Sequence, residues 1–306
     1  MIQYLWLVPL GFMVGTFGTL IGAGGGFILV PVLLILYPDK SPDTITSISL
    51  AVVFFNAISG SVAYARMKRI DFKSGVWFAA ATVPGSILGS ITTSMIPRQL
   101  FNGIFGVLLV AMAVFLFAQA KGEEHKAMAD GKLHITRRLM DKTGMEYVFS
   151  YNPVTGIVLS VFVGYLSSLL GIGGGIIHVP ALVSLLNYPV HIATATSHFI
   201  LAIMALSGSV VHVLNGVLYP GLKQIIALGI GVLFGAQLGA RLSNRIQGKV
   251  IIRSLAAALG LVGIRIFTMV FSGDIHTFLY ILLVMAGLCF ISLLVWLAVR
   301  RAKARG

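Results

Sequence analysis

Charged side chains are scarce in this sequence. Only 10% of the 306 residues are Asp, Glu, Lys or Arg, whereas 58% are hydrophobic and the mean hydropathy is +0.97. A soluble domain usually carries about 25% charged and roughly 45–50% apolar residues. Because so few charges cannot cover a water-facing surface, the composition excludes a soluble enzyme, a disordered chain and a small secreted domain held by disulfides. The sequence predicts an integral membrane protein.

Acidic residues and cysteine are scarcer still. The nine acidic residues all lie in or beside breaks between apolar stretches, so we expect no carboxylate deep in the bilayer. The single cysteine, Cys289, excludes an intramolecular disulfide. No basic segment precedes the first apolar run, which argues against a cleaved signal peptide. The sequence also lacks a Walker motif, paired acids in the spans and a metal-ligand cluster, so we expect neither an enzyme nor a cofactor or metal site.

Long apolar runs dominate what is present. A transmembrane helix needs about 20 mostly apolar residues to cross a hydrocarbon core of roughly 30 Å. Seven stretches meet this requirement, and we predict a membrane-spanning helix in each of them: 44–65, 74–96, 100–120, 192–214, 221–243, 250–272 and 277–299.

Two further apolar stretches, 4–37 and 153–188, are too long for one crossing, and glycines interrupt each of them. After each glycine cluster only about a dozen apolar residues remain, which as a helix reach about 16–18 Å, or half the core. We therefore predict re-entrant hairpins or broken helices, with the glycines near the middle of the membrane.

The distribution of basic residues predicts the orientation. If the N-terminus is outside and both hairpins return to the side they left, 18 of the 22 Lys and Arg residues face the cytoplasm. Such an excess satisfies the positive-inside rule. We therefore read the net charge of +13 as a topology signal, not as a nucleic-acid-binding surface, and expect a multi-pass membrane protein with a cytoplasmic C-terminus.

The glycine clusters head an internal repeat. Each cluster and the proline after it recur at an offset of 149 positions, so that Gly22 corresponds to Gly171 and Pro31 to Pro180. Matches continue along the chain at offsets of 148 and 150. Since each repeat contains one hairpin and three crossings, the two halves must have opposite orientation. Inverted repeats are typical of secondary transporters, whose substrate sites lie where discontinuous helices meet.

Two GxGGG-x4-P motifs, one opening each half of a polytopic chain with a cytoplasmic connector, resemble the sulfite exporter (TauE/SafE) family. The resemblance covers about residues 10–299. It implies transport of small, often sulfur-containing anions such as sulfite, sulfonates and related organic anions.

The glycines are the first candidates for a substrate site. A helix that starts after each cluster directs free N–H groups and its positive dipole end toward the middle of the membrane, where two such ends would bind an anion. The alternative is that the glycines only permit close helix packing. The candidate substrate-binding glycines are Gly24, Gly25, Gly26, Gly173, Gly174 and Gly175.

Polar side chains on the first span after each hairpin are the second group of candidates. Ser49, Asn56 and Ser197 would complete the coordination of sulfonate or carboxylate oxygens, although a serine can instead bond back to its own helix. His178 and His198 lie near the clusters and are candidates for coupling anion movement to a proton. Neutral histidines could equally bond across helices, and we assign His212 a lower chance of a proton role.

We therefore predict an all-α membrane protein of four parts: a first repeat (1–120), a cytoplasmic connector (121–152), an inverted second repeat (153–273) and a final helix with a basic tail (274–306). The connector is expected to be a surface helix or a flexible link. Arg265 is expected to snorkel to the interface or to attract anions there. The predicted function is alternating-access transport of a small anion, with a proton or sodium ion as the coupling ion and an anion channel as the alternative; a homo-oligomer is compatible with the sequence.

Overall fold

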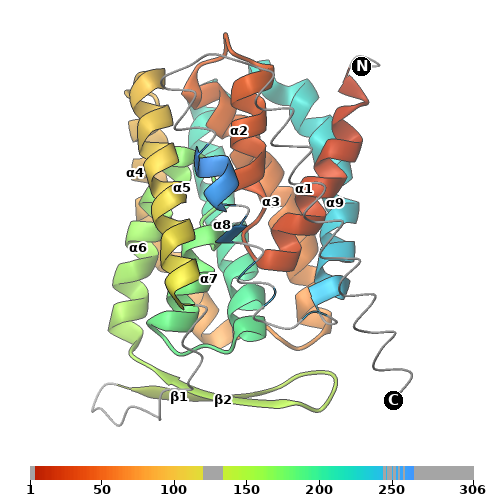
Figure 1. The fold of residues 1–306 in the computed structure, drawn as a ribbon, viewed down its shortest axis with the longest axis vertical. Coiled ribbons are helices and arrows are strands. Elements are labelled where there is room, and N and C mark those ends of the chain that lie inside the picture. Colours follow the sequence, from red (N-terminus) through yellow and green to blue (C-terminus); the bar gives the residue numbers. More distant parts are fainter. Residues whose placement is uncertain are drawn as a thin grey trace.

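The computed structural model describes residues 4–119 and 134–243, together with residues 246, 250, 253, 256–257 and 259–264. These residues form a helical bundle with a short β-hairpin at one end, which we call the hairpin end (Figure 1). Five helical segments in the described part are long and apolar enough to cross a membrane: Pro42–Arg66, Phe72–Thr93, Pro153–Leu170, Val190–Leu214 and Tyr219–Ser243. The described apolar part of the helix predicted over 100–120, Arg98–Val114, is shorter. The prediction of a helical, multi-pass membrane protein is thus confirmed.

The long helices begin and end close to the predicted limits. Ser41 accepts a hydrogen bond from the Thr44 N–H and so caps the first turn of α3, while Asp71 caps α4 in the same way. The long helices are α3 (Pro42–Arg66), α4 (Phe72–Thr93), α5 (Arg98–Gln119), α8 (Val190–Leu214) and α9 (Leu222–Ser243), the last following a 3-10 turn, η2 (Tyr219–Gly221).

Some predictions fall on residues that the structure does not describe. These are the first part of the connector (121–133), most of the span predicted over 250–272, the whole of the span predicted over 277–299, and Arg265.

Both glycine-interrupted stretches consist of two helices, as predicted. The first stretch forms α1 (Leu7–Ile21) and α2 (Gly26–Leu36), and the second forms α6 (Pro153–Leu170) and α7 (Gly175–Ser184). At each break the chain reverses: α2 runs back toward the end where α1 began, and α7 runs back toward the hairpin end (Figure 1). The reversal starts at Gly22 and Gly171, whose φ angles of 81° and 67° favour glycine.

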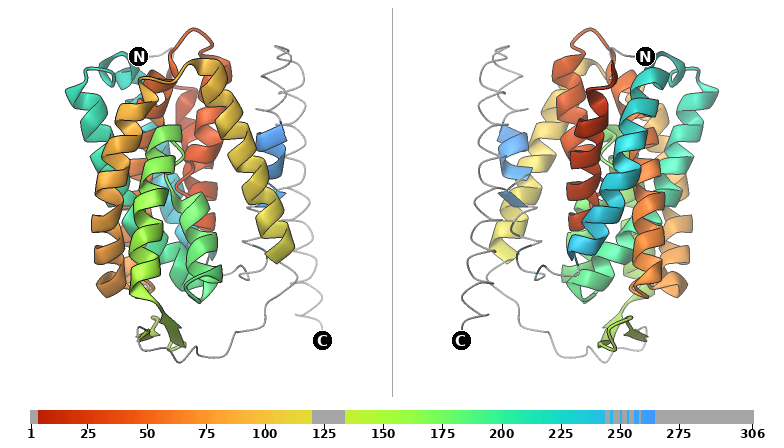
Figure 2. Two further views of the ribbon diagram at one scale, coloured as in Figure 1. Left: turned by 90° about the vertical axis from the view of Figure 1, so that its left-hand side faces the viewer. Right: turned by 90° about the vertical axis from the view of Figure 1, so that its right-hand side faces the viewer.

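Glycines also bring whole helices into backbone contact. Helix α4 packs along α6, and α1 packs along α9, so that each broken pair is held by a long helix from elsewhere in the chain (Figure 2). A Cβ atom placed on Gly85 would lie 2.1 Å from the carbonyl oxygen of Val161. A Cβ atom would also lie 2.2 Å from a carbonyl oxygen at three further glycines: at Gly89 from that of Tyr165, at Gly235 from that of Phe12 and at Gly239 from that of Thr16. Small residues at membrane helix interfaces permit this packing.

The second part of the connector differs from the prediction. Two antiparallel strands, β1 (Ile135–Met140) and β2 (Glu146–Tyr151), replace the expected surface helix or flexible link, with Ile135 opposite Tyr151. The physical reason is an alternation of period two: Leu139, Tyr147 and Phe149 pack against the bundle, whereas Arg138, Met140 and Val148 are exposed.

An ion pair attaches the hairpin to the bundle. Arg69, between α3 and α4, donates through Nε and Nη2 to Asp141 Oδ2 at 3.2 and 3.0 Å. Burial alone would raise the pKa of the Asp141 carboxyl, but hydrogen bonds from Thr143, Arg69 and the Met145 N–H outweigh it and lower the pKa to about 2. Because the folded pKa is depressed, this attachment is present at neutral pH and is lost only as the pH falls through about 2.

The glycine contacts predict the effect of one added methyl group. In Gly85→Ala the methyl meets a backbone oxygen that cannot move aside alone, so we expect a loss of about 1–3 kcal/mol in stability. Thermal unfolding of the purified protein in detergent measures this loss. Gly103→Ala is the matched control, because nothing lies within 4 Å of a Cβ atom at Gly103 in α5. Equal unfolding temperatures for the two variants would contradict the packing described.

Candidate functional site

The two glycine breaks touch each other inside the bundle. A Cβ atom on Gly26 would lie 2.6 Å from the carbonyl oxygen of Gly171, and one on Gly175 would lie 2.1 Å from that of Gly22. The candidate glycines Gly24, Gly25, Gly26, Gly173, Gly174 and Gly175 are all buried. The structure thus brings together the two clusters that lie about 150 positions apart in the sequence.

Helices α2 and α7 both start at this contact with free backbone donors. In α2, Ile28 and Leu29 donate to the carbonyl of Gly25, and within the described residues the N–H groups of Gly26 and Phe27 have no acceptor. In α7, Ile177 and His178 donate to Gly174 in the same way, but the Gly175 N–H donates to the Gly173 carbonyl at 2.8 Å. Within the described residues α7 therefore has one N–H group without an acceptor, that of Ile176, where α2 has two. Each start directs the positive end of a helix dipole into the interior, where an anion is stabilised.

Two apolar side chains fill the space beside the glycines. A Cβ atom on Gly24 would lie 2.3 Å from Leu201, and one on Gly173 would lie 2.7 Å from Val53. Val53 and Leu201 are fully buried, one from α3 and one from α8. In this conformation the centre is closed, because side chains occupy the space next to the backbone of both breaks.

The two candidate serines bond across the centre. Ser49 donates to the carbonyl of Gly171 at 2.6 Å, and Ser197 donates to that of Gly22 at 3.3 Å. Neither hydroxyl bonds back to its own helix, which was the alternative interpretation of the sequence. Ser47 does bond in this way, since its hydroxyl donates to the Thr44 carbonyl. The carbonyls that end a broken helix need partners inside a membrane, and these hydroxyls supply them.

Asn56 belongs to a buried chain of hydrogen bonds that ends at His198. Its amide nitrogen donates to the Gly24 carbonyl at 2.9 Å, and its oxygen accepts from the Thr19 hydroxyl at 3.0 Å. His198 Nε2 lies 3.1 Å from the Thr19 oxygen. Since the single hydroxyl proton of Thr19 points to Asn56, Nε2 must be the donor. In neutral His198 the lone pair is therefore on Nδ1, which has no partner among the described residues.

The other two membrane histidines lie away from this chain. His178 Nε2 is 3.3 Å from the Ser160 hydroxyl, which itself donates to Gly156, so His178 joins α7 to α6. His212 lies in the last turn of α8, and its Nδ1 is 3.1 Å from the carboxylate of Asp43. Within the described residues no group of three or more His, Cys, Asp or Glu side chains is placed to hold a metal ion.

Sequence reasoning missed several residues around the breaks. Thr19 links Asn56 to His198, and Val53 and Leu201 close the centre. Ser167 has a hydroxyl without a partner in the described part of the chain, 3.1 Å from the Cβ position of Gly174. A signal did exist: the offset of 148 that aligns the spans also relates Val53 to Leu201.

The polar chain predicts that Asn56 stabilises the break. Asn56→Ala leaves the Gly24 carbonyl and the Thr19 hydroxyl without their partner, so we expect about 1–3 kcal/mol of destabilisation for each group. Ser47→Ala is the control, because that hydroxyl bonds only within its own helix. Thermal unfolding in detergent compares the two, and a larger loss for Ser47→Ala would be inconsistent with the chain.

Comparison with known proteins agrees with this architecture. The Bacillus subtilis "Probable membrane transporter protein YunE" is 34% identical over 267 residues, covering 85% of this chain and 96% of that protein. "Probable membrane transporter protein MJ0441" of Methanocaldococcus jannaschii is 26% identical over 279 residues, with 86% and 96% covered. No solved structure matches the chain. The sequence model of the sulfite exporter TauE/SafE family matches residues 7–266. The chain is a membrane transporter of the sulfite exporter TauE/SafE family.

Proposed function

We propose that this chain is a secondary transporter of small anions, with sulfite, sulfonates or related sulfur-containing organic anions as the substrate class. The proposed substrate class is taken from the family to which the chain belongs. The observation that carries the proposal is the contact of two glycine breaks in the interior, each followed by a helix whose first turn has at least one N–H group without an acceptor in the described part of the chain. Such helix starts bind anions without a buried lysine or arginine.

The proposed site is formed by two halves of opposite orientation. The packing glycines support this arrangement, because residues at equivalent repeat positions make equivalent contacts. Gly85 packs on the backbone of Val161, and Gly235 packs on that of Phe12. The two glycines are 150 positions apart in the sequence, and their two partners are 149 positions apart. Inverted halves around a central site are the usual basis of alternating access.

The proposed orientation places the hairpin end in the cytoplasm. The end of α2 and the starts of α5 and α9 lie at the opposite end, near the N-terminus (Figure 1), and the basic residues there are Lys40, Arg98 and Lys223. Most other basic residues of the described part lie at the hairpin end: Arg66, Lys68, Arg69, Lys73, Arg137, Arg138, Lys142 and Arg241. This bias matches the positive-inside rule and puts the N-terminus outside.

Substrate binding requires the centre to open. In the proposed cycle the two halves rock apart, Val53 and Leu201 withdraw, and the anion takes their place against the N–H groups of Gly26 and Phe27. Ser49, Asn56 and Ser197 then exchange some of their bonds to carbonyls for bonds to substrate oxygens. Closure from the other side restores the bonds described above, which stabilise the empty protein.

His198 is the proposed proton carrier. Its Nδ1 lone pair is buried beside the polar chain, and the ring of Tyr64 packs edge-on against it with a centroid distance of 5.8 Å. A proton on Nδ1 would place a positive charge close to the break, where it attracts the anion. His178 has a simpler role in joining two helices.

The transport proposal predicts saturable uptake of radiolabelled sulfite by proteoliposomes that contain the purified protein. Uptake that follows an imposed proton or sodium gradient supports a carrier, whereas a high conductance in planar bilayers supports the channel alternative. Gly174→Val should abolish uptake, because a side chain there enters the site. Gly216→Val is the control: its φ of 72° is similar, but nothing lies within 4 Å. Equal uptake by both variants would refute the central site.

The coupling proposal predicts a change in pH dependence. His198→Gln retains a donor toward Thr19 but cannot titrate, so the pH dependence that His198 confers on the uptake rate should be lost. His178→Gln should keep the wild-type profile. Uptake of a labelled alkanesulfonate, whose own charge does not change with pH, measures both, and an unchanged profile in His198→Gln would exclude it as the proton carrier.

A further inference from the structure

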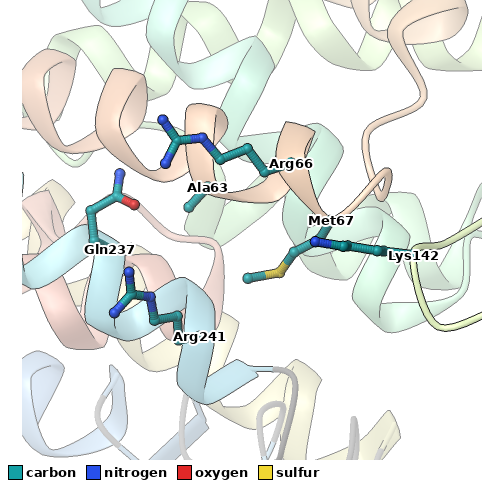
Figure 3. A pocket seen from close by; sticks show the side chains of 6 residues that line it. All are labelled: Ala63, Arg66, Met67, Lys142, Gln237 and Arg241. Atoms are coloured by element: carbon teal, nitrogen blue, oxygen red, sulfur yellow. The ribbon is translucent and has the colours of Figure 1, made fainter.

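A basic pocket of about 260 Å³ lies at the hairpin end of the bundle, apart from the central site. Helix α3, helix α9 and the turn of the β-hairpin form its walls. Figure 3 shows the guanidinium groups of Arg66 and Arg241 gathered with the amide of Gln237 on one side, while Lys142 extends from the hairpin. The lining residues are Ala63, Arg66, Met67, Lys142, Gln237 and Arg241.

Among the described residues, no ion pair neutralises the three cations of this pocket. In the part of the chain that the structure describes, Asp141, Asp71 and Asp43 form the ion pairs, and their partners are other residues. The pocket lining contains no carboxylate. Three like charges around one hollow repel each other and concentrate field lines inside it, so the pocket attracts anions.

The general rules for basic residues explain only part of this arrangement. Arg66 and Arg241 end their helices, where cations interact favourably with the dipole, and the proposed cytoplasmic side favours basic residues. Neither rule requires the two arginines to converge on one hollow. Neither rule explains why the amide of Gln237 lies between the two arginines, or why Lys142 lies opposite them (Figure 3).

The inner wall of the pocket adjoins the polar chain of the central site. Gln237 donates to the carbonyl and hydroxyl oxygens of Ser59 at 2.7 and 2.9 Å. The next residue, Gly60, packs directly on His198, since a Cβ atom there would lie 2.5 Å from its ring. One layer of α3 therefore separates the pocket from His198.

The hairpin holds Lys142 in position. The Lys142 N–H donates to the carbonyl of Met67 at 3.0 Å, and the preceding residue, Asp141, forms the ion pair with Arg69. Backbone and ion-pair contacts thus fix the main chain that carries Lys142 opposite the two arginines, which makes the hairpin a structural part of the pocket.

We propose that this pocket binds a small oxyanion and serves as the cytoplasmic antechamber of the transport path. The volume suits a small tetrahedral or pyramidal anion with water, and the donors are of the kinds that bind sulfonate, sulfate and phosphate oxygens. These donors would also bind a lipid phosphate. The pocket binds the free anion instead, because the wall opposite the two arginines is the β-hairpin, which lies outside the helical bundle. The role in transport rests on the proposed function, whereas binding does not.

Equilibrium binding of radiolabelled sulfate to the purified protein in nanodiscs tests the site. In neutral phosphatidylcholine we expect binding that Arg66→Gln together with Arg241→Gln weakens by about tenfold or more. Arg66→Lys should retain most of it. The control is Arg138→Gln together with Lys73→Gln, which removes the same two charges from exposed positions that do not line the pocket. Equal binding by the double variant and the control would overturn the proposal. So would phosphatidylglycerol that co-purifies with the wild type alone and abolishes sulfate binding.

Transport kinetics separate this pocket from the central site. In proteoliposomes the double variant should raise the KM for sulfite several-fold with the maximal rate retained, and the difference should shrink at high ionic strength. Asp141→Asn should raise the KM in the same direction by releasing Lys142. A fall in maximal rate with unchanged KM would contradict the antechamber. If the wild type transports no sulfite, the proposed function fails while sulfate binding still decides the pocket.

Discussion

The structure depends on how backbone polar groups find partners where lipid supplies none. A helix that stops inside a membrane leaves carbonyl and N–H groups that must be paired within the protein or face a polar cavity. Here Ser49, Ser197 and Asn56 pair the carbonyls of the broken helices, and each lies on a different helix from the carbonyl it binds. The N–H groups that start α2 remain without an acceptor in the described chain. This asymmetry between paired carbonyls and free donors is the basis on which we propose that the centre binds an anion.

The same constraint explains the glycines. Where two breaks meet, backbone packs on backbone, and a Cβ atom at Gly26 or Gly175 would enter the other break. The long helices repeat this solution along α1 and α9 and along α4 and α6, so each broken pair is clamped by a long helix. Rigid clamping leaves the breaks themselves, and the side chains of Val53 and Leu201 between them, as the elements that must move in the proposed cycle. In the described part of the chain the charged side chains lie near the ends of the bundle, and at one end the hairpin and its ion pair complete a basic pocket.

Much of this arrangement follows from sequence pattern. Hydropathy located the long helices to within a few residues, and the length of each apolar arm after the glycines predicted the two reversals. The β-hairpin was missed, because its alternation is short and lies beside charged residues that also suit a surface helix. The sequence indicated which polar residues lie near the glycine breaks, but it did not indicate most of the groups to which they form hydrogen bonds. Ser49 and Asn56 were expected to face a ligand, but they bind carbonyls, since a pairing across 122 positions is invisible in one sequence. Thr19 and Leu201 look like ordinary span residues until the fold places them.

A structure determined with sulfite in a lipid nanodisc tests the central claim most directly. The account predicts density for the anion between the two glycine breaks, within hydrogen-bonding distance of the first N–H groups of α2 or α7, with Val53 and Leu201 displaced. Density for sulfite elsewhere in the membrane interior, with the two breaks still in contact, would contradict it.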